Sequence, residues 1–217
     1  NPVTLLSDTT LNSSVSGAVT FNSTVDTDSA AAALRALTIN SDGVTTFNAA
    51  VGDTRELSSL TIQGFTNAAD GNTVINAGSI NTAGDQTYNN PVTLLSDTIL
   101  NSSDAGAVTF NSTVDTDSAA TALRALTINS DGVTTFNAAV GAIDALSSLK
   151  VQGFLVSARA LGNTVINAGS INTAGDQTYN NPVTLLSDTT LNSSDAGVVT
   201  FNSTVDTDSA AAVIRSL

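Results

Sequence analysis

Four residue types are missing from this 217-residue chain: cysteine, histidine, methionine and tryptophan. Without cysteine, the chain has no disulfide framework, no thiolate metal site and no cysteine nucleophile. Without histidine, it has no Ser-His-Asp triad, no imidazole base and no histidine ligand for zinc. These absences exclude several common forms of nucleophilic and metal-assisted catalysis.

Basic and aromatic residues are scarce. The chain has 6 lysines and arginines against 19 acidic residues, so its formal net charge is −13. A surface of this sign repels nucleic acids and anionic membranes. No apolar run approaches the roughly 18 residues of a membrane span, so we expect no membrane insertion. With 41% hydrophobic but only 4% aromatic residues, the composition favours thin layers of small aliphatic and β-branched side chains.

Repetition is the main feature that the chain does have. The string NPVTLLSD begins at Asn1 and recurs at Asn90 and Asn181. It divides the chain into long repeats 1–89 and 90–180 and a partial repeat 181–217. We expect one continuous domain over residues 1–217. Because the chain begins at Asn1 without a signal peptide, we expect it to be a segment of a longer protein.

The short-range pattern predicts strands. Stretches such as Val19–Phe21 and Leu37–Ile39 alternate apolar residues with threonine, and Gly and Asn separate them. Short strands in coils of roughly 18–28 residues predict an all-β fold, a parallel β-helix (β-solenoid) with about four coils per 89–91-residue repeat. The coils are predicted to begin near Leu11, Ile39, Ile62 and Ile80. An antiparallel sandwich is the alternative, which the recurring register disfavours.

Three sets of side chains recur at fixed places and predict ladders from coil to coil. One asparagine set follows the first apolar position of a coil: Asn12, Asn40, Asn81, Asn101, Asn129, Asn172 and Asn192. The other follows the aromatic or isoleucine position: Asn22, Asn48, Asn76, Asn89, Asn111, Asn137, Asn167, Asn180 and Asn202. The aromatic set, which we expect to stack in one continuous core column, is Phe21, Phe47, Tyr88, Phe110, Phe136, Tyr179 and Phe201. For the asparagines, contact with a sugar is the functional alternative.

Acidic pairs provide the only metal candidates. The pairs Asp26/Asp28, Asp115/Asp117 and Asp206/Asp208 supply oxygen ligands of the kind that Ca²⁺ takes. Two carboxylates are too few ligands alone, and the pattern matches neither the EF-hand nor the Gly-rich Ca²⁺ nonapeptide. We therefore expect solvated acidic turns and no cofactor, with Ca²⁺ as the single candidate.

Some segments leave the regular pattern. The Ala-rich segment 28–37 is predicted to form a helical turn capped by Ser29, with an extended loop as the alternative. The segments 53–57 and 153–161 have diverged most between copies, so a specialised surface is expected there. These loops are expected to interrupt the outward threonines, which argues against the flat threonine array that ice binding requires.

The few cations argue against an enzyme. Polysaccharide lyases and hydrolases built on β-helices rely on carboxylate clusters with Arg or Lys. Three of the arginines are repeat copies of one position, as in a scaffold, and Lys150 is the only lysine. The arginines are Arg35, Arg55, Arg124, Arg159 and Arg215.

The segment Ile80–Tyr88, followed by VTL at 92–94 and VTF at 108–110, resembles the filamentous-haemagglutinin-like surface proteins, and so does the recurring Leu-Thr-Ile-Asn-Ser. These are long bacterial exoproteins secreted by two-partner or autotransporter routes. The resemblance covers the whole chain. It implies a right-handed parallel β-helix, an extracellular or bacterial cell-surface location, and roles in adhesion, aggregation or surface coating.

From this resemblance we expect a non-catalytic rod or stalk segment of a surface fibre or adhesin. The expected partners are other copies of the chain, end to end or laterally, and cell-surface glycans or proteins. The alternatives are a carbohydrate-active β-helix enzyme and a glycan-binding adhesin surface.

Overall fold

A computed structural model describes residues 1–29, 33–68, 70–117, 122–154, 162–208 and 216–217. In these ranges the regular structure is entirely β-strand, and every strand pair is parallel. The described part of the chain therefore contains no helix long and apolar enough to cross a membrane. The prediction of an all-β fold with parallel strands is confirmed.

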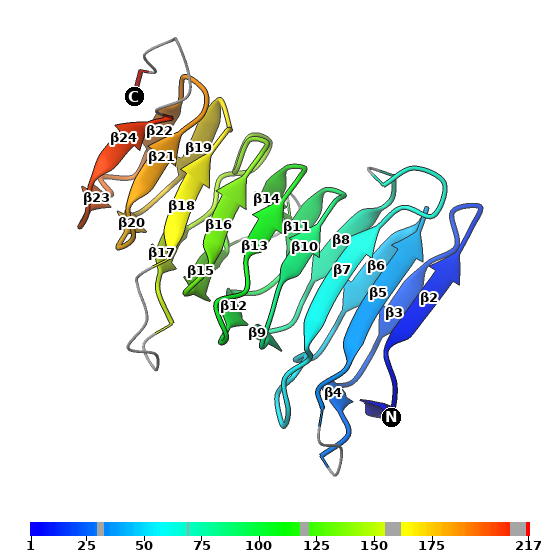
Figure 1. The fold of residues 1–217 in the computed structure, drawn as a ribbon. Helices are drawn as coiled ribbons and strands as arrows, with labels where there is room; N and C mark the ends of the chain where they lie inside the picture. The colour runs from blue at the N-terminus through cyan, green and yellow to red at the C-terminus, as the bar shows by residue number, and fades with distance from the viewer. Residues whose placement is uncertain (30–32, 69, 118–121, 155–161, 209–215) are drawn as a thin grey trace.

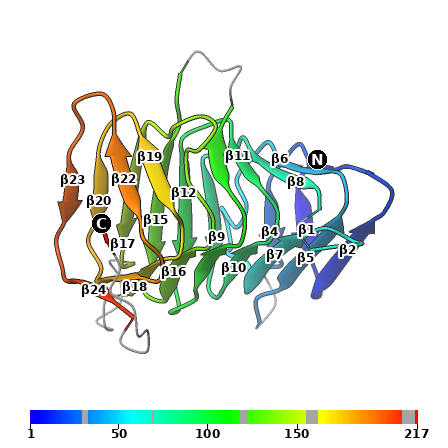
Figure 2. The ribbon, with the colours of Figure 1, turned by 90° about the horizontal axis from the view of Figure 1, so that it is seen from above.

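The strands form three stacks, named here sheets I, II and III (Figure 1; Figure 2). Sheet I contains β1 (Val3–Leu5), β4 (Val25–Thr27), β9 (Ser79–Thr82), β12 (Thr98–Ser102), β15 (Ala125–Ser130), β17 (Ser148–Gln152), β20 (Gln177–Tyr179) and β23 (Val199–Phe201). Sheet II contains β2 (Thr9–Ser13), β5 (Ala36–Ser41), β7 (Ser59–Gln63), β10 (Gln86–Tyr88), β13 (Val108–Phe110), β16 (Val133–Phe136), β18 (Asn163–Ile166), β21 (Val183–Leu185) and β24 (Val205–Thr207). Sheet III contains β3 (Val19–Phe21), β6 (Val44–Phe47), β8 (Asn72–Ile75), β11 (Val92–Leu94), β14 (Val114–Thr116), β19 (Ser170–Thr173) and β22 (Thr190–Ser193).

Single residues complete sheets I and III. Val51 bridges Val25 of β4 to Ile80 of β9, and Val140 bridges Val114 of β14 to Ile171 of β19. With these two residues counted as strand positions, the chain visits the sheets in the order I, II, III from β1 to β24.

The sequence repeat and the sheet order have different periods. One long repeat contains eleven strand positions, the ten strands β1 to β10 together with Val51. Since eleven is not a multiple of three, equivalent strands in successive repeats lie on different sheets. Thus β1 lies in sheet I, its copy β11 in sheet III, and the third copy β21 in sheet II.

The pairing corrects the predicted coil boundaries. Leu11 pairs with Ile39 and Ile39 pairs with Ile62, as expected. However, Ile62 pairs with Tyr88, whereas Ile80 lies in sheet I opposite Val51. The similarity between the stretches around Ile39 and Ile80 reflects a recurring strand–turn pattern and not a shared sheet.

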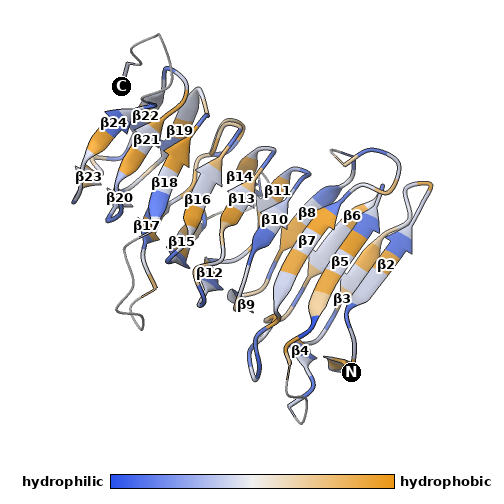
Figure 3. Ribbon diagram, viewed as in Figure 1, coloured by the Kyte–Doolittle hydropathy of each residue, from blue (hydrophilic) through white to orange (hydrophobic). Residues whose placement is uncertain are grey.

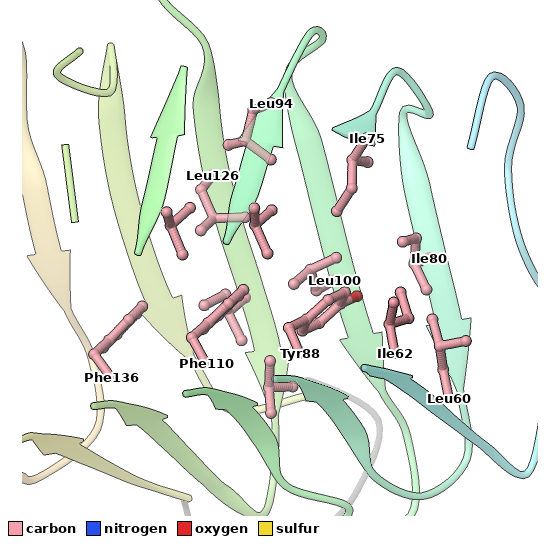
Figure 4. Close-up of a cluster of buried hydrophobic side chains, with 14 of the residues drawn as sticks. Leu60, Ile62, Ile75, Ile80, Tyr88, Leu94, Leu100, Phe110, Leu126 and Phe136 are labelled. Atoms are coloured by element: carbon pink, nitrogen blue, oxygen red, sulfur yellow. The ribbon is translucent and has the colours of Figure 1, made fainter. Parts of the chain in front are cut away.

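Inward side chains of all three sheets meet in one hydrophobic core (Figure 4). Because successive side chains of a strand point to opposite faces, buried and partly exposed residues alternate, as in β5, where Leu37, Ile39 and Ser41 are buried. Figure 3 shows the same alternation as orange and pale bands along the strands.

The aromatic side chains form three stacks, so the prediction of a single column is wrong. Phe21 stacks on Phe47 in sheet III with ring centroids 5.2 Å apart. Tyr88, Phe110 and Phe136 stack in sheet II, and Tyr179 stacks on Phe201 in sheet I. The eleven-position repeat is the reason, because it moves each copy to another sheet. All three stacks still belong to, or pack against, the same core.

Glycines mark corners where consecutive strand levels approach too closely for a side chain. A Cβ atom at Gly132, between β15 and β16, would lie 2.5 Å from the carbonyl oxygens of Ala105 and Gly106. A Cβ at Gly43, between β5 and β6, would lie 2.5 Å from the carbonyl oxygen of Ser16. Backbone therefore packs directly on backbone at these corners, which only glycine allows.

The helical turn predicted for residues 28–37 is wrong for Ala36 and Leu37, which begin β5, and residues 30–32 lie outside the described residues. Most of the variable segment 153–161, together with Arg159 and Arg215, also lies outside them.

Candidate functional site

Outward amide side chains form hydrogen-bonded ladders along the sheets. On sheet II, bonds of 2.7–3.3 Å join Asn12, Asn40, Gln63, Asn89, Asn111, Asn137 and Asn167. On sheet I, bonds of 2.6–3.0 Å join Asn81, Asn101, Asn129, Gln152, Asn180 and Asn202. On sheet III, Asn22, Asn48 and Asn76 form one ladder, and Asn172 and Asn192 form another.

The two asparagine sets do not form separate ladders. On sheet II, Gln63 bonds to Asn40 of the first set and to Asn89 of the second. Sequence reasoning missed Gln63 and its copy Gln152, although each follows the buried apolar residue of its strand as the asparagines do. Each rung ties neighbouring strands together, which is the structural role expected of such ladders.

The predicted Ca²⁺ residues lie within or directly after one strand of each sheet. Asp26 and Asp115 occupy the centres of β4 and β14, and Asp206 occupies the centre of β24; Asp28, Asp117 and Asp208 follow these strands directly. The Asp26 carboxylate accepts N–H bonds from Thr54 (2.8 Å) and Arg55 (3.2 Å). Asp115 accepts them from Ile143 and Asp144 in the same way. Among the described residues, no three acidic side chains are grouped so that they could hold a metal ion.

Other aspartates accept backbone N–H bonds from a residue 22–28 positions further along the chain. They are Asp8, Asp42, Asp85, Asp97, Asp131, Asp176 and Asp188. Much of the acidic composition therefore has a local function, because each carboxylate satisfies a donor at the corner of the next strand level.

Asp42 links this arrangement to pH. The Thr66 hydroxyl (2.6 Å) and the N–H groups of Thr66 and Phe65 donate to its carboxylate, which holds the pKa of Asp42 below its ordinary value. A carboxyl group with a lowered folded-state pKa stabilises the fold above its unfolded pKa, and this contribution is lost as the pH falls through the folded pKa. We expect Asp42→Asn to flatten the loss of unfolding free energy below about pH 4, measured by urea unfolding between neutral and acidic pH. The exposed Asp53→Asn is the control, and an unchanged pH slope in Asp42→Asn would contradict this role.

Buried tyrosines have polar partners inside the core. The Tyr88 hydroxyl donates to Gln86 Oε1 (3.0 Å), and Gln86 Nε2 donates to the carbonyl oxygens of Asn101 (2.8 Å) and Ile80 (3.2 Å). Burial raises the pKa of Tyr88 far above its ordinary value, so its hydroxyl remains a donor. Gln177 and Tyr179 repeat the arrangement. Sequence reasoning missed these glutamines, although an inward Gln two residues before an inward Tyr was readable at 86–88 and 177–179.

An open hollow of about 650 Å³ lies beside the variable segment 53–57. It is lined by Leu34, Gly52, Asp53, Thr54, Arg55, Glu56, Asn81, Asn101 and Phe154. The Arg55 guanidinium donates to the backbone oxygen of Asp28, and Glu56 accepts a bond from the Ser103 hydroxyl (2.8 Å). In the second repeat, Asp144 and Ala145 replace these two charged residues.

Outward threonines form an unbroken rank on sheet II. The rank contains Thr10, Thr38, Thr61, Thr87, Thr109 and Thr135, each paired with the next in register. Val165 follows Thr135 and ends the run. The expectation that loops interrupt the outward threonines is therefore wrong for this sheet, because loops leave the chain between strands and not within them.

The outer surface of the described residues thus carries amide ladders, a threonine rank and hollows lined in part by charged residues. No protein-family model, curated protein or solved structure matches this chain.

Proposed function

We propose that the chain is a right-handed parallel β-helix that serves as a rigid, non-catalytic rod segment of a bacterial surface fibre or adhesin. One observation carries this proposal: the chain visits sheets I, II and III in unbroken order, and each strand pairs in parallel with the strand one circuit further along. A right-handed connection is by far the commoner hand for parallel strands.

The rod properties follow from the strand pairing. Three successive strand positions, one on each sheet, make one circuit, and each circuit adds one strand spacing of about 4.8 Å to the length of the rod. The eleven strand positions of one repeat make about 3.7 circuits and therefore add about 18 Å. Hydrogen bonds, amide ladders and a common core join each level to the next, as in other solenoids. Length is then set by the number of repeats, which suits a spacer.

The resemblance of the repeat strings to filamentous-haemagglutinin-like proteins supports an extracellular or cell-surface location. The same resemblance supports assembly with other copies, end to end or laterally, and contact with surface glycans or proteins. The absence of histidine and the scarcity of cations support a non-catalytic role.

Deleting residues 90–180 tests the rod geometry. This deletion joins Asn89 to Asn181 and recreates the natural Asn-Asn-Pro junction, because the sequence after Asn181 copies that after Asn90. We expect the shortened chain to remain folded and its maximum dimension to fall by about 18 Å. Small-angle X-ray scattering of both chains measures the change, with circular dichroism as the control for folding.

Two results would contradict the rod. One is a shortened chain without a β-sheet signal. The other is a folded chain that shrinks equally in all directions, as a globular domain would when it loses part of its mass.

Glycan binding at the hollow beside Arg55 is a second candidate. Its support is the combination of two amide rungs, Asn81 and Asn101, with the Phe154 ring and the charged residues Arg55 and Glu56. Binding to a glycan array that is lost in a variant carrying Arg55→Asp and Glu56→Ala, the residues of the second repeat, would favour it. Release of unsaturated sugar products would instead favour a lyase and overturn the non-catalytic proposal.

A further inference from the structure

Sheet II presents two adjacent ranks of polar side chains. The threonine rank runs from Thr10 to Thr135, and the amide rank runs beside it from Asn12 to Asn137. Along the rod the side chains repeat about every 4.8 Å, and along each strand the two ranks lie about 7 Å apart. The six strands that carry the two ranks, β2, β5, β7, β10, β13 and β16, lie side by side in sheet II (Figure 1). Their outward hydroxyl and amide groups therefore form a two-dimensional lattice.

The lattice is regular on sheet II and interrupted on sheet I. The repeat copies of Thr10 and Thr61 are Ile99 and Lys150, and both lie in the outward rank of sheet I, on either side of Thr127. Because the two residues that differ from threonine lie on sheet I, the threonine rank on sheet II is uniform. Exposed isoleucine and lysine side chains are tolerated at these positions of the fold.

The lattice is also rigid. Five of its threonines are half-buried and Thr10 is exposed. Each threonine belongs to a strand whose backbone is held by pairing with the neighbouring strands. The amide rank is fixed further by bonds from rung to rung. A ligand would meet groups that are already in place, which lowers the entropic cost of binding.

Charge and area narrow the choice of ligand. No charged side chain stands in either rank, although the chain has a net charge of −13. Asp8 and Asp85 lie at the edge, where their carboxylates accept backbone N–H bonds. The twelve side-chain positions of the six strands and two ranks cover about 400 Å², half of the roughly 800 Å² per partner of a stable protein interface. The ranks contain no aromatic ring on which a sugar would stack.

An ice surface, which is uncharged and periodic, fits these features. The threonine hydroxyls and amides offer hydrogen bonds at a fixed spacing close to the repeat of the ice lattice. We propose that the threonine–amide lattice of sheet II binds ice. This function is independent of whether the rod belongs to an adhesin.

The test uses the whole chain and its partition into a slowly growing ice hemisphere, with thermal hysteresis as the second readout. The variant Thr61→Lys places a charged, long side chain in the middle of the lattice, and Lys150 shows that this repeat position accepts lysine. The matched control is Thr127→Lys, a half-buried outward threonine of sheet I. We expect the unchanged chain and Thr127→Lys to enter the ice and Thr61→Lys to remain in the liquid.

Thermal unfolding of all three chains establishes that they are equally folded, and Thr87→Leu replaces Thr61→Lys if the lysine variant unfolds. Exclusion of the unchanged chain from ice would overturn the proposal, and so would an equal loss in Thr61→Lys and Thr127→Lys. Self-association that is abolished by Thr61→Lys, without ice binding, would also overturn it and assign the lattice to a second copy. None of these results bears on the deletion of residues 90–180, so failure of the rod and failure of ice binding are distinguishable.

Discussion

Replacing Gly132 by alanine is expected to destabilise the chain by about 2–3 kcal/mol. The new Cβ atom would lie 2.5 Å from two carbonyl oxygens, those of Ala105 and Gly106. Both are backbone atoms, so neither can rotate away as the end of a side chain would. The corner between β15 and β16 must move away from the preceding corner, which strains the pairing of β13 with β16. The free energy of urea unfolding measures the effect.

Gly169→Ala is the matched control. It is a glycine-to-alanine change at a position where a Cβ atom would meet nothing within 4 Å. We expect its free energy of unfolding to lie within about 0.5 kcal/mol of the unchanged chain. Equal losses in the two variants would contradict the role of the backbone contact at Gly132, because the effect on the unfolded chain that both variants share stabilises the fold.

Local features of the fold were predictable because they depend on a few neighbouring residues. The alternation in Leu37-Thr38-Ile39 predicted a strand with Thr38 outward, and the structure has this strand as part of β5. The sheet on which a strand lies depends instead on the number of strand positions before it. Two of those positions are the single residues Val51 and Val140, which show no strand pattern of their own. The repeated sequences alone therefore did not show that equivalent strands of successive repeats lie on different sheets.

The number of residues between two strands that pair on one sheet varies, which also made the sheet of each strand unpredictable from sequence. Bonded rungs of the sheet II ladder are separated by 22 to 30 residues along the chain. Loops of different lengths leave a sheet and return to it without changing the strand register. A comparison by fixed spacing therefore placed Ile80 on the sheet of Ile62, when Tyr88 lies there.

The ladder positions were predicted where the same residue, asparagine, recurs. They were missed where glutamine supplies the same amide group. Asn40 and Asn89 were found as asparagines, whereas Gln63 between them has the same amide on a longer side chain. The bond of Asp26 was not predictable, because its donors Thr54 and Arg55 belong to a loop 28 and 29 residues further along the chain. The threonine rank became visible only when the sheet of each outward threonine was known.

Phe110→Ala is expected to cost about 3–5 kcal/mol, the range for removing a buried phenylalanine. The Phe110 ring is 1% exposed and lies between two parallel rings, with centroids 5.1 Å from Tyr88 and 5.5 Å from Phe136. Its removal leaves a cavity between two rings that are held by their own strands and cannot close on each other. The free energy of chemical unfolding measures the loss, and the near-ultraviolet signal of the two tyrosines, of which Tyr88 lies in this stack, reports on the packing.

Phe201→Ala is the control for this cavity. Phe201 stacks on one ring, Tyr179, and is only partly buried against the core, so its removal leaves a smaller void and a smaller loss. In a stack where each level contacts only its neighbours, a weak internal level also uncouples the levels on its two sides. We therefore expect Phe110→Ala, and not Phe201→Ala, to broaden the unfolding transition. Equal losses and equally sharp transitions would mean that the levels do not depend on one continuous core.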